Sequence, residues 1–165
     1  MNLLSASDPG HSMGNTSRRQ KGVAAVEMAF ILPFLLLLFL GLTQIGWLFL
    51  NSISVVNSTS ESARFFASQR GVANPYTNTQ TQLRAAASIL TPTGLSIATA
   101  VNGVPCSTDA GCAAALASAS SPSVSIPATV TVTYTGFQPL FSGSFYDLNV
   151  LMPSVLTASA VERVQ

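Results

Sequence analysis

The stretch KGVAAVEMAFILPFLLLLFLGLTQIGWLF, Lys21–Phe49, decides the fold of this chain. From Met28 to Leu50 no residue is charged, and most are Leu, Phe, Ile or Ala. As an α-helix this run would extend about 35 Å, which exceeds the roughly 30 Å of hydrocarbon in a bilayer. We therefore predict a membrane-spanning helix over residues 23–50. The alternative is a helix buried in a soluble protein, which is disfavoured because the run leaves no polar face for water.

The charged residues around this helix predict its orientation. Three basic residues precede it, and the first basic residue after it is Arg64. Because positive flanks stay on the cytoplasmic side, we expect a cytoplasmic N-terminus and export of residues 51–165. The basic residues of the leader are Arg18, Arg19 and Lys21.

Composition argues against several classes of protein. Only 8% of the 165 residues are charged, against about a quarter in ordinary soluble domains, and the net charge is +1. No basic stripe exists, so no nucleic-acid partner is expected. The single histidine, His11, precedes the apolar run, so the exported part has no Ser-His-Asp or Cys-His arrangement. We expect no enzymatic activity, no cofactor and no metal.

A glycine and a glutamate stand at the start of the apolar run. Gly22 follows the basic residues, and Glu27 is the last acidic residue before Glu61. Taken alone, Gly22 could be a linker glycine, and Glu27 could be a carboxylate that reaches the membrane surface without a partner. Cleavage after the apolar run, as in a secretory signal peptide, is disfavoured because the run is too long and no A-x-A pattern ends it.

Lys21–Phe49 resembles the N-terminus of TadE-like pseudopilins, minor pilin-like proteins of the tight-adherence (Tad/Flp) branch of the type IV pilus family. The pilin pattern is a basic leader ending in glycine, a cleavage site, a glutamate at the fifth mature position and a long apolar helix. Here it places the cut between Gly22 and Val23 and makes Glu27 the fifth residue. Met28 stands where the family often has an aromatic residue. Two later segments, residues 57–71 and TASAVERVQ at the C-terminus, resemble the family more loosely.

The resemblance implies a function and a set of partners. A prepilin peptidase would remove a cytoplasmic leader, residues 1–22. Glu27 would then pair with the new N-terminal ammonium, on Val23, of a neighbouring subunit. The protein would be a minor pseudopilin of the bacterial inner membrane with a periplasmic domain, able to reach the extracellular pilus. It would contact other minor pseudopilins, the assembly platform and pilin subunits through their N-terminal helices. The alternative is an uncleaved single-pass anchor with an exported interaction domain.

Residues 51–70 are expected to continue the helix outside the membrane. Glu61 and Arg64 are three positions apart and would pair on its surface. Gly71 is a plausible stop for the helix, with Pro75 beyond it. The expected apolar face comprises Ile53, Val56, Ser60, Ala63 and Ala67, with Phe66 beside them.

Residues 71–165 are expected to form an exported α+β domain, in which the long helix packs on a small antiparallel sheet. A second helix is predicted over Thr79–Leu90, ended by Pro92 and Gly94. In the second of the three predicted strands, the Val and Tyr residues would face the helix and the Thr residues would face outward. Phe137–Pro153 would be a loop. The predicted strands are Leu95–Val101, Ser123–Tyr134 interrupted by Pro127, and Val155–Val164.

Cys106 and Cys112 are the only cysteines, and their segment VPCSTDAGCAAA is turn-like. In an exported domain this pair predicts a disulfide. Because the loop is short, the chain-entropy model gives only about 2–2.5 kcal/mol of stabilisation. Metal binding is disfavoured, since two ligands are too few.

Overall fold

The computed structural model describes residues 16–119, 125–141 and 152–165, with side chains from residue 22 onward. Residues 1–15 of the predicted leader, the start of the strand predicted at Ser123 and most of the predicted loop Phe137–Pro153 lie outside this range. The chain divides into two compact units, Met1–Leu42 and Thr43–Gln165. We describe each by itself.

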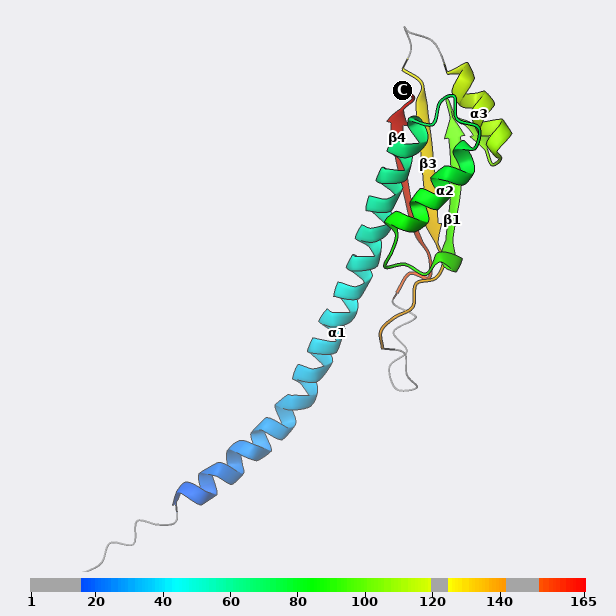
Figure 1. Ribbon diagram of the computed structural model, residues 1–165. Coiled ribbons are helices and arrows are strands. Elements are labelled where there is room, and N and C mark those ends of the chain that lie inside the picture. Colours follow the sequence, from blue (N-terminus) through cyan, green and yellow to red (C-terminus); the bar gives the residue numbers. More distant parts are fainter. Residues whose placement is uncertain (1–15, 120–124, 142–151) are drawn as a thin grey trace, which may run out of the picture. The chain divides into compact units, whose positions relative to one another are not determined.

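Helix α1, Thr16–Ala67, carries the whole apolar run (Figure 1). From Gly22 to Ala67 it has 46 residues, and its most apolar window has a mean hydropathy of 2.6 with none of it buried. By length and composition it is able to cross a membrane. At 1.5 Å per residue it is about 69 Å long, more than twice the thickness of a hydrocarbon core, so its C-terminal part is available for other packing. Pro33 lies inside the helix without ending it.

The second unit is built on a four-stranded antiparallel sheet with the strand order β2-β1-β3-β4. The predicted class, a long N-terminal helix followed by a small antiparallel sheet in an α+β fold, is confirmed. The strands are β1 Leu95–Val101, β2 Val104–Cys106, β3 Pro127–Tyr134 and β4 Leu156–Arg163. The helical elements besides α1 are α2 Pro75–Ala86, the 3-10 turn η1 Pro92–Gly94 and α3 Asp109–Ser118.

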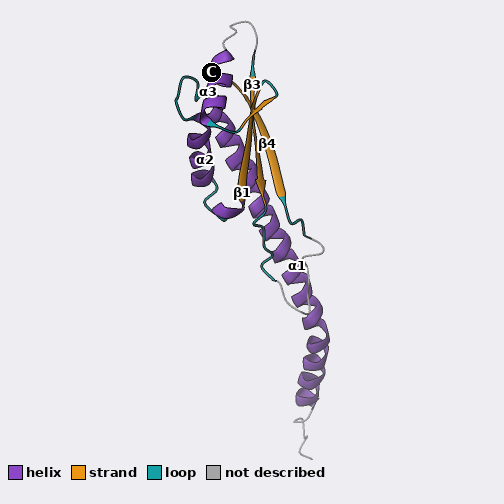
Figure 2. Cartoon of the chain, turned by 90° about the vertical axis from the view of Figure 1, so that its right-hand side faces the viewer, coloured by secondary structure: helices purple, strands orange, loops and turns teal. Residues whose placement is uncertain are grey.

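One face of the sheet is covered by helices, and Figure 2 shows α2 and α3 on this side. The alternation along β3 matches the sequence prediction: Ala128, Val130, Val132 and Tyr134 are buried, and the threonines between them are only partly covered. The same core contains residues of α1 (Val55, Phe66), α2 (Leu83) and α3 (Leu116).

Three predictions about the elements outside α1 need correction. Helix α2 begins at Pro75, not Thr79, because the fixed φ of proline and its missing N–H suit the first helical position. It ends at Ala86 rather than Leu90. The segment predicted as a turn, residues 104–115, instead contains strand β2 and most of helix α3.

The prediction for residues 51–70 is also partly wrong: α1 ends at Ala67, and its buried face differs from the expected one. Ile53 and Val56 are more than half exposed, whereas Val55 and the small polar residues around it are buried. Ser58 and Thr59 donate their hydroxyl hydrogens to the carbonyl oxygen of Val55, so burial leaves them satisfied. Ala63, Phe66 and Ala67 are buried as expected.

Glu61 and Arg64 do not pair with each other as predicted. The Arg64 Nε lies 3.2 Å from Glu162 Oε1 of β4. Glu61 accepts a hydrogen bond of 2.8 Å from the amide of Gln82 in α2. Both charges therefore join α1 to other elements, which local spacing along the helix does not reveal.

Candidate functional site

The residues predicted for processing and assembly lie on the exposed N-terminal part of α1. Gly22, Val23, Glu27 and Met28 are helical and exposed. Val23 and Glu27 are four positions apart, so their side chains leave the same face of the helix. The basic positions Arg18, Arg19 and Lys21 lie on the first turns of α1.

The structure gives no packing reason for glycine at position 22. A Cβ built on Gly22 would meet no atom within 4 Å. Glycine inside a helix costs roughly 1 kcal/mol relative to alanine. Gly41 and Gly46 in the same helix share this property, so it does not distinguish Gly22 from them. The cleavage and pairing assigned to Gly22, Val23 and Glu27 remain predictions.

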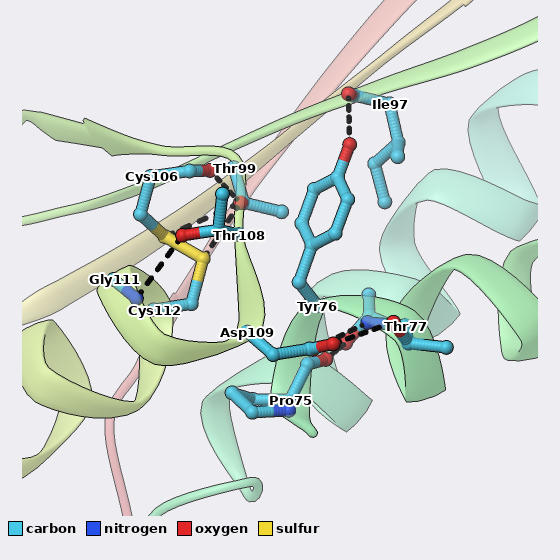
Figure 3. Close-up of a disulfide and its surroundings, with 11 residues drawn as sticks. Pro75, Tyr76, Thr77, Ile97, Thr99, Cys106, Thr108, Asp109, Gly111 and Cys112 are labelled. Atoms are coloured by element: carbon cyan, nitrogen blue, oxygen red, sulfur yellow. Dashed lines mark hydrogen bonds between the residues drawn. A yellow bond between two sulfur atoms is a disulfide. The ribbon is translucent and has the colours of Figure 1, made fainter. Parts of the chain in front are cut away.

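The predicted disulfide between Cys106 and Cys112 is present (Figure 3). It joins the end of β2 to the first turns of α3, and Cys112 is fully buried. The hydroxyl of Thr99 on β1 donates to the carbonyl oxygen of Cys106 at 2.5 Å. The bridge therefore fixes α3 against the sheet edge.

Asp109, in the first turn of α3, links α3 to α2. Its carboxylate accepts hydrogen bonds from the backbone N–H of Thr77 at 2.8 Å and from the Thr77 hydroxyl at 2.6 Å (Figure 3). Asn74, the residue before α2, makes no side-chain cap, so Asp109 caps α2 from another helix. Two hydrogen bonds from Thr77 lower the pKa of Asp109. The bond from the hydroxyl lowers this pKa more than the bond from the backbone N–H does.

The segment after β3 is held by two residues of α1. Gln44 is fully buried, and its Oε1 accepts hydrogen bonds from the backbone N–H groups of Leu140 and Phe141, at 3.1 and 3.4 Å. The indole N–H of Trp47 donates to the carbonyl oxygen of Gln138 at 3.1 Å. The compact domain therefore takes in α1 from Thr43, including residues that the sequence assigned to the membrane span.

A cavity of about 420 Å³ lies beside this contact. Its floor is close-packed: a Cβ on Gly94 would come within 2.6 Å of the Gly136 nitrogen. The hydroxyl of Tyr134 donates to the Gly136 carbonyl at 2.9 Å and lies 3.0 Å from Thr91 Oγ1. The ten lining residues offer hydroxyls, amides and two aromatic rings, and none of these ten is charged.

A long exposed apolar helix that continues into a small α+β domain suggests single-pass membrane anchoring. The TadE-like protein family matches this chain over residues 22–64, so the resemblance predicted from the sequence is confirmed over that segment. The match begins at Gly22 and contains Val23 and Glu27. It is consistent with a TadE-like protein of the Tad pilus system. No curated protein and no solved structure matches the chain.

Proposed function

We infer that this protein is a minor pseudopilin, a structural subunit that takes part in the assembly or initiation of a Tad-type pilus or secretion filament. The observation that carries this proposal is the TadE-like match, which starts at the residue predicted to precede the cut. In this proposal the protein is a component of the apparatus rather than an enzyme.

Processing is the first step of the proposed function. A prepilin peptidase cuts between Gly22 and Val23 and removes residues 1–22. Glycine before the cut suits a protease cleft, because a residue without Cβ allows close backbone approach. The basic leader holds this junction at the anionic cytoplasmic surface of the inner membrane.

Pairing is the second step. The cut leaves an ammonium on Val23, and a neighbouring subunit supplies the carboxylate of Glu27. In the low dielectric between packed helices such a pair is favourable only when the two groups are in register, so it selects the stagger between subunits. The exposure of Val23 and of the apolar residues that follow leaves this part of α1 available to neighbouring helices. The partners are other minor pseudopilins, pilin subunits and the assembly platform, and the C-terminal domain is periplasmic.

The mass of the mature chain tests this function. We expect loss of residues 1–22 in cells that contain the peptidase and retention of them when Gly22 is replaced by a bulkier residue, such as Gly22→Val. Glu27→Ala should be cleaved normally but fail to enter sheared filaments. A full-length mature chain would instead indicate the alternative, an uncleaved single-pass anchor with an exported interaction domain.

A further inference from the structure

The two edges of the sheet are protected to different degrees. At the β1 edge, β2 pairs with Thr99 and Val101, and the hydroxyl of Tyr76 donates to the carbonyl oxygen of Ile97 at 3.5 Å. Strand β2 has only three residues, and its middle residue is Pro105, which has no N–H to offer a further strand. Short strands and proline are common ways in which proteins block an edge.

Strand β4 forms the other edge, and its register shows which of its backbone groups are not directed toward β3. The backbone N–H of Val164 donates to Ile126 at 3.0 Å, in register with the ladder that pairs Arg163 with Pro127. Hydrogen-bonded pairs alternate along an antiparallel ladder. The even-numbered residues of β4 therefore bond to β3, and the odd-numbered residues direct their N–H and C=O groups away from the sheet. These outward residues are Thr157, Ser159, Val161 and Arg163.

Among the described residues, β4 is less protected than β2, although it carries the charged residues Glu162 and Arg163. The strand has eight residues, contains neither proline nor lysine, and has all four outward residues exposed. Val161 is 60% exposed. Free backbone groups along an exposed strand are the feature that strand-addition complexes use.

We propose that the free edge of β4 binds an extended strand from a different polypeptide that carries a carboxylate near Arg163. The charges at this end of β4 favour an acidic partner. Glu162 is already paired with Arg64 of α1, whereas Arg163 has no acidic partner among the described residues. A strand added beside β4 gains backbone hydrogen bonds from the edge and specificity from Arg163.

A second copy of this chain is a poorer occupant. Strand β4 and residues 43–67 of α1 run in the same direction. Near the start of this α1 segment, Trp47 contacts Gln138, which follows the end of β3 that pairs with the start of β4. At the other end, the Ala67 carbonyl accepts a hydrogen bond from the N–H of Gln165. Antiparallel pairing of two β4 strands would point the two helical segments 43–67 in opposite directions. Copies anchored in one membrane, as the proposed function requires, share one direction. A copy translated in the same orientation would present β2, where Pro105 blocks pairing. A copy rotated about the strand direction would present β4 in parallel, a pairing that is slightly less stable per residue.

The test uses the full chain in host membranes with the photo-crosslinker p-benzoylphenylalanine at position 157, on the free edge. We expect one main adduct, whose crosslinked peptide, sequenced by mass spectrometry, comes from another protein and contains Asp or Glu. Ser159→Pro and Val161→Lys should each reduce the yield of the adduct at least fivefold. Proline at position 159 removes only an N–H that points away from β3, and a lysine at position 161 disfavours pairing with a further strand. Ser159→Ala should leave it unchanged, and Arg163→Glu should reduce it as the edge variants do.

Two measurements keep the outcomes distinct. Circular dichroism of each purified variant shows whether the fold is kept; if Ser159→Pro is misfolded, Val161→Lys decides. No adduct, an adduct with a second copy or with lipid, or an adduct insensitive to both edge variants would overturn the proposal. The mass of the mature chain in the same sample reports on the proposed function separately, since a strand bound to an uncleaved chain would support the edge while contradicting the pseudopilin assignment.

Discussion

Arg64 of α1 and Glu162 of β4 form an ion pair across 98 positions of sequence, with 3.2 Å between Nε and Oε1. The pair joins the last turn of the long helix to the C-terminal strand. Close to it, the N–H of Gln165 donates to the carbonyl oxygen of Ala67 at 3.1 Å. Gln165 is therefore attached to the end of α1, so this end of the helix and the edge strand β4 are held together.

We expect the Arg64–Glu162 pair to orient the end of α1 against β4 more than to stabilise the fold. The side chains are 74% and 37% exposed, and exposed pairs contribute about 0–1 kcal/mol. Arg64→Ala should therefore lower the free energy of unfolding by less than about 1 kcal/mol. A double-mutant cycle with Glu162→Ala, followed by urea unfolding in detergent, measures the coupling. A coupling well above that range would contradict this prediction.

Asp109 should make the domain sensitive to acid. Its pKa is lowered in the folded state from an ordinary value of 3.8, so its stabilising effect is complete above that value and is lost as pH falls through the lower folded pKa. Asp109→Asn is the matched variant. The difference in urea midpoint between the wild type and this variant should be constant from about pH 7 to 5 and should shrink below about pH 4. A difference that stays constant at low pH would show that the carboxylate charge plays no part.

Removing the Cys106–Cys112 bridge should cost about 2–2.5 kcal/mol, because the closed loop is short. Cys106→Ala together with Cys112→Ala should lower the free energy of unfolding by this amount in detergent. Wild-type protein treated with reductant should move in the same direction. Peptide mapping without reductant checks that the bridge is formed, and two freely alkylated cysteines would contradict the structure.

Gly94 is required by a close contact between backbones. A Cβ at this position would lie 2.6 Å from the Gly136 nitrogen, which is not able to rotate away as a side chain would. We expect Gly94→Ala to destabilise the domain by about 1–3 kcal/mol. Gly46→Ala is the control, since a Cβ there meets nothing within 4 Å and alanine favours a helix. Equal effects of the two substitutions on the melting temperature would argue against the contact.

The core of the domain should depend on α2. Leu83 is 1% exposed, so Leu83→Ala should lower the free energy of unfolding by about 2–5 kcal/mol. Ile89 is 62% exposed, so Ile89→Ala should change the free energy of unfolding by less than about 0.5 kcal/mol. Urea unfolding of both variants checks this contrast. A small loss at Leu83 would show that α2 does not contribute to the core.

Some elements were predictable because their signals are local. Strand β1 lies at the predicted residues, and β4 differs from its prediction only at the ends. Strand β3 begins at Pro127, which was predicted to interrupt it. The missed strand β2 also had a local signal. Asn102 and Gly103 have φ angles of 52° and 77°, and Asn-Gly between two strands favours a tight hairpin. Helix α3 had a similar signal in Thr108, whose hydroxyl accepts from the N–H of Gly111.

The sequence alone determined the long apolar helix, the α+β class and the TadE-like start, because hydrophobicity, alternation and motif spacing act over a few neighbouring residues. Only the tertiary structure decided which side of α1 faces the sheet, which acid Arg64 contacts and which edge of the sheet is free. Ser58 and Ser62 are buried while Ile53 is exposed because small side chains allow the helix to approach the sheet closely. That choice depends on the shape of the opposing surface, which no local pattern contains.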